Sequence, residues 1–97
     1  MACRRCGFGR THPVPSLETL KKAYGQEEYF RSRGMWDEES SEAFGRRARS
    51  LAGRWGLGGL LDVGCGEGAF LHAARKEGFQ VKGSEISAVA VSRARAL

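Results

Sequence analysis

The stretch Leu60-Leu61-Asp62-Val63-Gly64-Cys65-Gly66-Glu67-Gly68 decides the fold of this chain. Its first four residues form a short apolar run with one acid, which predicts a buried strand. Three glycines follow, and residues 69–77 then place apolar side chains at helical spacing. A glycine turn between a strand and a helix lets a ligand approach the backbone closely. The stretch therefore predicts a strand, a tight turn that can hold a ligand, and a helix.

A second strand and a second helix follow this first unit. Gly78 ends the predicted helix, residues 79–83 are the next strand, and Ser87 is a suitable cap for a final helix. Alternation of strands and helices predicts parallel strands with right-handed crossovers. Glu85 stands 21 residues after Gly64. An acid about 20 residues past the first glycine is where nucleotide-binding folds hold ribose hydroxyls.

The composition divides the chain into three parts. Residues 1–15 are a loop rich in Cys, Gly and Pro, residues 16–59 are mainly helical, and residues 60–97 are the α/β unit. In the middle part, Ser16 is expected to cap a helix that stops at Gly25. A second helix places four apolar side chains on one face, namely Phe44, Ala48, Leu51 and Trp55.

Length and charge exclude several classes of protein. At 97 residues the chain is too short for several domains, and no apolar run is long enough for a membrane helix. The opening residues do not resemble a secretion signal, so the cytosol is the expected compartment and no membrane partner is expected. The net charge is +5. Acidic groups dilute the basic ones, which favours a solvated surface over a nucleic-acid interface.

The acids of the glycine turn favour one ligand class over another. Gly64, Gly66 and Ala69 satisfy the pattern of dinucleotide-binding turns. However, carboxylates at Asp62 and Glu67 would repel a pyrophosphate, by about 4 kcal/mol at 4 Å for an effective dielectric constant near 20. A ligand with a cationic group at this point is favoured instead, and S-adenosylmethionine carries an ammonium and a sulfonium and has no phosphate.

The motifs LLDVGCGEG and VKGSEIS resemble the first two sequence motifs of class I S-adenosylmethionine-dependent methyltransferases, over residues 60–97. The resemblance implies that Asp62 contacts the ammonium of the cofactor, that Glu85 holds the ribose and that Ile86 lies against the adenine. It also implies that three glycines line the methionine part and that Cys65 is a small packing residue among them. The implied cofactor site is Asp62, Gly64, Cys65, Gly66, Gly68, Glu85 and Ile86.

The resemblance also implies a larger fold than these residues supply. The family has a seven-stranded Rossmann-like sheet with helices on both faces, and residues 60–97 match only its first β-α-β-α portion. We therefore expect an incomplete, N-terminal part of a methyltransferase that is inactive alone. Its first strand would keep an unpaired edge, through which the chain could self-associate. Neither the methyl acceptor nor a catalytic base is identified by the sequence.

The N-terminal loop contains a second motif, Cys3-Arg4-Arg5-Cys6-Gly7. This spacing lets two thiolates reach one zinc ion, but a structural zinc needs four ligands. His12 is a weak candidate for a third. The loop resembles the second half of a small zinc ribbon found before some class I methyltransferase domains. A first half upstream, a decayed ribbon, and a zinc shared by two chains remain open, and a redox pair is less favoured.

The role of several side chains in the middle part, and two alternative functions, remain open. The middle part carries aromatic side chains that either pack it onto the sheet, which we favour, or face a substrate, namely Tyr24, Tyr29, Phe30, Trp36 and Phe44. It also carries two arginines that could bind an acidic group of a substrate, Arg31 and Arg33. The alternative functions are a fragment of an NAD(P)- or flavin-dependent oxidoreductase and a non-enzymatic zinc-knuckle module with a basic helical segment.

Overall fold

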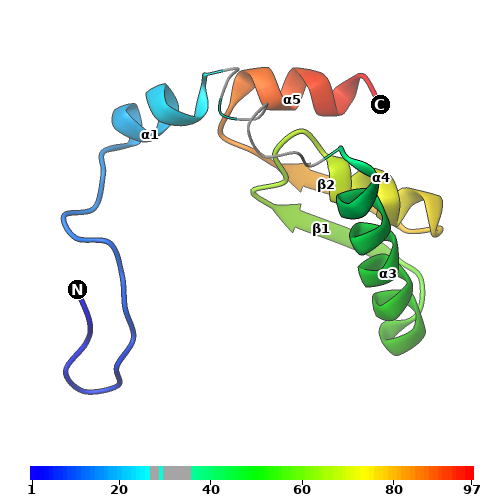
Figure 1. Cartoon of the computed structure of the whole chain (residues 1–97), viewed down its shortest axis with the longest axis horizontal. Helices are drawn as coiled ribbons and strands as arrows, with labels where there is room; N and C mark the ends of the chain where they lie inside the picture. The colour runs from blue at the N-terminus through cyan, green and yellow to red at the C-terminus, as the bar shows by residue number, and fades with distance from the viewer. Residues whose placement is uncertain (27–28, 30–35) are drawn as a thin grey trace.

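The computed structural model describes residues 1–26, 29 and 36–97 (Figure 1). The elements follow in the order α1 (Leu17–Tyr24), α3 (Glu38–Trp55), β1 (Gly59–Val63), α4 (Ala69–Lys76), β2 (Gln80–Ser84) and α5 (Ala88–Arg95). The two strands are parallel neighbours, with Leu60 opposite Val81 and Asp62 opposite Gly83. The mixed α/β architecture with a parallel strand pair is therefore confirmed, and β2 begins one residue later than expected.

Side-chain caps fix where the helices begin. Ser16 accepts the backbone N–H of Thr19 at 3.1 Å, and Ser87 accepts that of Ala90 at 3.3 Å, so both predicted caps are confirmed. Asp37 caps α3 by accepting the N–H of Ser40 at 2.7 Å. Hydrogen bonds from the backbone and hydroxyl of Ser40 lower the pKa of Asp37. These caps satisfy donors that the first turn of a helix leaves without intrahelical partners.

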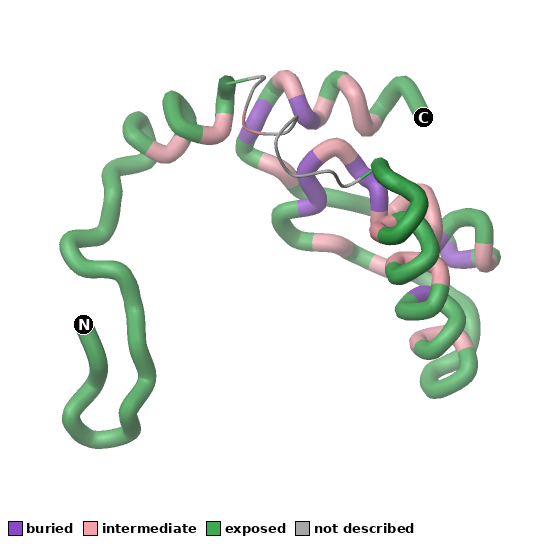
Figure 2. Tube along the Cα trace, viewed as in Figure 1, coloured by how far each residue is buried: buried purple, intermediate pink, exposed green. Residues whose placement is uncertain are grey.

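The core lies between the sheet and two helices on one of its faces. Helix α3 packs on α4, and α4 packs on β2. Ala48 of α3 and Ala74 of α4 are fully buried, and Phe79 is 8% exposed beside them. The small alanine side chains let the two helices approach closely, while Leu60 and Val81 of the paired strands pack against the same cluster. Figure 2 shows the buried positions concentrated in the half of the molecule that contains the sheet and the helices beside it.

One expectation about burial is wrong. Strand β1 is not buried on both faces, because Leu61 and Val63 are 66% and 77% exposed. All described helices that pack on the sheet lie on the Leu60 side, so the opposite face has no cover within the described residues. Trp55 is also 77% exposed, since the packed stripe of α3 ends at Ala52 and Trp55 is in the last turn.

The first part of the chain is a separate arm. Its first ten residues form a hairpin closed by an antiparallel bridge between Ala2 and Gly9. All residues from 1 to 19 are exposed, and Figure 1 shows this arm and α1 extending away from the sheet. Phe30, Arg31 and Arg33, singled out in the sequence, lie outside the described residues. Among the described helices, none is long and apolar enough to cross a membrane.

Candidate functional site

The glycine turn is tied directly to the end of the second strand. The backbone N–H groups of Gly64 and Cys65 both donate to the carbonyl oxygen of Ser84, at 2.8 and 3.0 Å. Gly64 has a φ of +78°, and no heavy atom lies within 4 Å of where its Cβ would be. The backbone at Gly64 is therefore open to a ligand, in a conformation that an L side chain rarely adopts.

Glu85 binds the turn through its carboxylate. One oxygen accepts the N–H of Gly66 at 2.8 Å. The other accepts the N–H groups of Ile86 at 2.7 Å and Ser87 at 3.0 Å. The structure thus brings together the predicted acid after β2 and the predicted glycines after β1. Gly66 and Glu85, which make this contact, are 19 residues apart in the sequence.

The acids of the site also act on the thiol between them. Burial raises the pKa of Cys65, and the negative charges of Asp62 and Glu85 raise it further. Cys65 is 8% exposed, so its side chain packs inside the site rather than facing solvent. Burial also raises the pKa of the half-buried Asp62, which lies on β1 opposite Gly83. The site therefore gathers two carboxyl groups around a buried sulfur.

Gly83 supports the site, although its sequence context predicts only that it lies in a strand. A Cβ there would lie 2.5 Å from Cδ1 of Leu71 and 2.6 Å from Sγ of Cys65. Only glycine lets α4 and the turn pack this closely on β2. The signal available in the sequence was a glycine inside a strand, which often marks a close approach.

Gly68 has a similar role on the other side of the turn. It begins α4 with a φ of +83°, and a Cβ there would lie 3.1 Å from Cβ of Ala94 in α5. The turn is therefore enclosed between β2, α4 and α5. Ile86, the predicted adenine contact, follows β2 with 40% of its surface exposed and remains accessible to a ligand.

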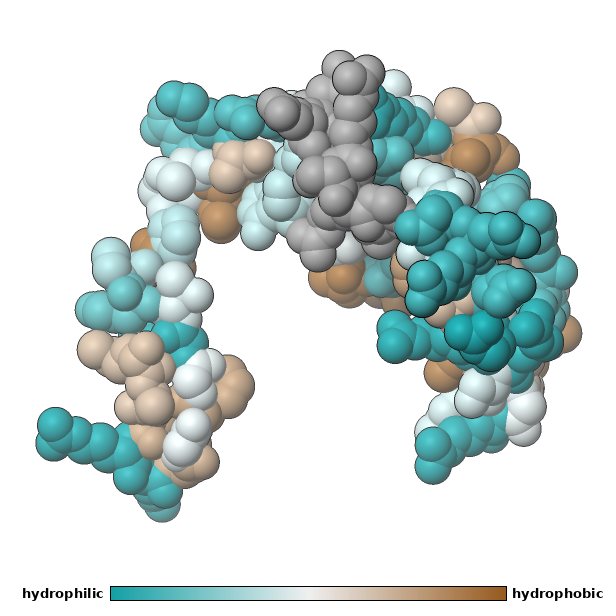
Figure 3. All heavy atoms as spheres, viewed as in Figure 1, coloured by the Kyte–Doolittle hydropathy of each residue, from teal (hydrophilic) through white to brown (hydrophobic). Residues whose placement is uncertain are grey.

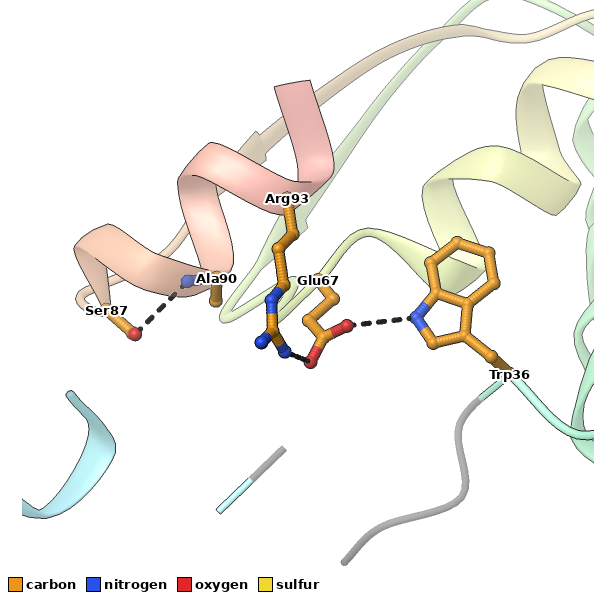
Figure 4. A network of polar contacts seen from close by, with 5 residues as sticks. All are labelled: Trp36, Glu67, Ser87, Ala90 and Arg93. Atoms are coloured by element: carbon orange, nitrogen blue, oxygen red, sulfur yellow. Dashed lines mark hydrogen bonds and ion pairs between the residues drawn. The ribbon is translucent and has the colours of Figure 1, made fainter. Parts of the chain in front are cut away.

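Glu67 is not a free negative charge, which corrects one step of the ligand argument. Its carboxylate is 2.9 Å from the guanidinium of Arg93 and accepts the indole N–H of Trp36 at 3.2 Å (Figure 4). Arg93 offsets the charge that was expected to repel a pyrophosphate. Of the two acids, only Asp62 is still expected to repel a pyrophosphate. The charge of the turn therefore favours S-adenosylmethionine over a dinucleotide less strongly than the sequence suggests. The sequence does not point to Arg93, and it predicts Trp36 only as a packing or substrate-facing aromatic side chain, because both residues reach the turn from distant segments.

A cavity of about 280 Å³ lies behind the turn, between α4, β2 and α5. Cys65 and Gly68 line it, but Asp62, Gly64 and Glu85 do not. His72 also lines it, and its buried Nδ1 has no hydrogen-bond partner among the described residues. The cavity faces the helices rather than the carboxyl ends of the strands, where ligands bind in open α/β sheets.

The predicted metal ligands do not join this site. Cys3 and Cys6 are exposed and unpaired by disulfides, on the N-terminal hairpin. Hydrogen bonds from the backbone of Cys6 and Arg5, and from the Cys6 side chain, lower the pKa of Cys3. Within the described ranges no group of three or more potential ligands could hold a metal ion, so His12 does not complete the set.

Comparison with known proteins identifies the family. A model of a methyltransferase domain family matches residues 35–96, well over half of the chain. The chain belongs to this family. The match confirms the resemblance read from the glycine turn, and the methyltransferase segment begins near Trp36 and includes α3 as well as the α/β unit. Searches of curated proteins and of solved structures returned no match.

Proposed function

We propose that this methyltransferase chain binds S-adenosylmethionine at the carboxyl ends of β1 and β2. Residues 60–97 would form the binding unit, residues 16–59 a helical cover and residues 1–15 a separate cysteine loop. The contact of Glu85 with the N–H of Gly66 supports the proposal most strongly. It places the acid of one strand over the glycine turn of its neighbour, as a ligand that spans both strand ends requires.

Each residue of the site has a role that its surroundings favour. Asp62 is a half-buried acid beside the turn and suits the ammonium group. The open backbone at Gly64 suits the methionine chain, and the exposed side chain of Ile86 suits the adenine. The fit is therefore consistent with a cofactor that is cationic at one end and carries an uncharged base at the other.

Glu85 would hold the ribose. An ionised carboxylate offers about four acceptor sites. Three backbone N–H groups already occupy sites on Glu85. About one site remains for a ribose hydroxyl, so binding both hydroxyls requires one backbone contact to open.

When bound, S-adenosylmethionine supplies a methyl group already activated by its sulfonium charge. The residues described above would bind and orient it, and orientation of reacting groups is worth about 7–11 kcal/mol in favourable cases. We assign no catalytic base and no acceptor.

Calorimetric titration of the whole chain with S-adenosylmethionine and, separately, with NAD tests this proposal. We expect selective binding of S-adenosylmethionine. Asp62→Asn and Glu85→Gln should each weaken it about tenfold, the effect of losing one hydrogen bond to a charged group. Glu42→Gln is the matched control, since Glu42 pairs with Arg46 on the exposed surface of α3.

Tryptophan fluorescence gives a second readout. In a Trp55→Phe chain only Trp36 remains, hydrogen-bonded to Glu67 of the turn. Its emission should change on titration with S-adenosylmethionine with the same midpoint as the calorimetry. Tighter binding of NAD, unchanged affinity in both site variants, or no binding at millimolar concentration would each overturn the proposal.

A further inference from the structure

The N-terminal hairpin has the backbone geometry of half a metal site. Its two cysteines flank a tight turn in which the N–H of Gly7 donates to the carbonyl of Cys3 at 2.8 Å, and Gly7 has a φ of +74°. The N–H of Cys3 donates to the carbonyl of Phe8 at 2.7 Å. Both bonds join Cys3 to residues that follow Cys6, so the backbone turn that carries Cys6 is closed on Cys3.

The two cysteines lie on the same short turn, three positions apart in the sequence. Both side chains are exposed, so a metal ion and a further chain can reach them.

The hairpin supplies only part of a complete ligand set. A structural zinc site is tetrahedral and closed by four protein ligands. In the segments that the structure describes, no third ligand lies with the two thiols. The remaining ligands must therefore come from elsewhere, and an identical hairpin would supply two thiolates with the same geometry. A two-fold axis through the metal would make that arrangement self-complementary.

We propose that two copies of this chain bind one zinc ion through Cys3 and Cys6 of each copy. Four thiols release four protons, and the resulting centre of one Zn²⁺ and four thiolates carries a net charge of −2. Arg4 and Arg5 lie between the cysteines in each copy and place four positive charges around that centre. The sequence between the ligands thus complements the charge of the complete site.

The surface around the hairpin fits a shared interface with a second copy. Four large apolar side chains of this arm are at least 60% exposed, namely Met1, Phe8, Val14 and Leu17. Figure 3 shows hydrophobic atoms gathered on the arm, and Figure 1 shows that it projects beyond the helices. A second hairpin brought in by the metal would cover apolar surface that the chain itself leaves exposed.

Titration of the reduced, metal-free chain with Co²⁺ and with Zn²⁺ tests the proposal. We expect saturation at one metal per two chains, and a Co²⁺ absorption spectrum of a tetrahedral site with four sulfur ligands. Sedimentation should show the mass doubling from 10.6 kDa on addition of Zn²⁺. Cys3→Ser and Cys6→Ser should each abolish both the spectrum and the doubling.

His12→Gln is the matched control, because it removes a potential ligand from the same arm and should change neither result. Circular dichroism of the metal-free variants checks that the helices are unaffected. Saturation at one metal per chain without a change of mass would overturn the proposal, as would a spectrum with nitrogen ligands. Failure of the reduced chain to bind either metal would also overturn it, and a Cys3–Cys6 disulfide that forms in preference to metal binding would favour a redox pair.

Discussion

Glu85 accepts the backbone N–H of Gly66 at 2.8 Å and so joins the end of β2 to the turn that follows β1. The same carboxylate accepts two further N–H groups, from Ile86 and Ser87. Glu85 therefore shapes the ligand-free turn as well as being the proposed ribose contact. A residue with both roles should affect stability and binding together.

Replacement of Glu85 should lower the stability of the chain without any ligand. Glu85→Ala leaves three N–H groups without their charged acceptor, which should cost about 1–3 kcal/mol in the free energy of unfolding. Urea unfolding monitored by circular dichroism measures this. Glu77→Gln is a suitable control, because Glu77 pairs with Arg49 at the surface and should cost less than 1 kcal/mol. Equal costs for the two variants would show that Glu85 does not organise the turn.

Substitutions at two glycines should act in opposite directions. Gly83→Ala forces a Cβ against Leu71 and Cys65, and overpacking of this kind costs about 1–3 kcal/mol. Gly53→Ala lies inside α3 with nothing within 4 Å, and should stabilise the chain by about 0.4–1 kcal/mol. Thermal unfolding measures both. A stabilising Gly83→Ala would contradict the close packing of α4 on β2.

Asp62 should make the chain less stable as pH rises. Burial raises its pKa in the folded chain above 3.8, so the folded state holds the proton more tightly than the unfolded state. The free energy of unfolding then falls as pH rises from about 3.8 through the raised pKa. Asp62→Asn should remove this loss and be more stable than the natural chain at pH 7, with the difference vanishing below pH 3.8.

Asp37 should give the opposite dependence of stability on pH when unfolding is measured in the same way. Hydrogen bonds from Ser40 lower its pKa, so its contribution is present above pH 3.8 and is lost as pH falls through the lowered value. Asp37→Asn keeps a good helix cap but loses the charge, and should be less stable than the natural chain at pH 7. Unfolding curves across pH 2–8 that show the same sign for both variants would contradict these assignments.

The Glu67–Arg93 pair should show a measurable coupling energy. Its side chains are only 14% and 33% exposed, at 2.9 Å, so solvent screens the pair less than it screens a surface pair. A double-mutant cycle with Glu67→Gln and Arg93→Met should give about 1 kcal/mol. The Glu42–Arg46 pair, at 67% and 63% exposure, is the reference and should give about 0.3–0.5 kcal/mol. A coupling no larger than the reference would show that Arg93 does not offset the charge of Glu67.

Local sequence signals predicted the elements well where residue types act on their own backbone. Ser16 and Ser87 cap helices as expected, and Gly78 follows α4 with a φ of +105°. The strand, glycine turn and helix from residue 59 onward were also predicted, with shifts of one residue at their ends. Hydrogen bonds to neighbouring N–H groups and the freedom of glycine at positive φ are local properties, so they are readable from sequence.

Burial and charge pairing were predicted less well. The exposure of Leu61, Val63 and Trp55 depends on which faces other elements cover, and no local pattern contains that information. The pairing of Glu67 with Arg93 and Trp36 joins residues 26 and 31 positions apart. A long-range partner of this kind changes the charge of a site without any sign in the motif itself.

The sequence by itself determined the order of strands and helices, the glycine turn and the acid that follows the second strand, because backbone preferences and spacing act within a few residues. Only the tertiary structure decided that Glu85 closes on Gly66, that Gly83 admits Cys65 and Leu71, and that Arg93 offsets Glu67. Those relationships arise when parallel strands and their helices bring distant segments within contact distance, and the energy of such contacts depends on burial that the whole fold creates.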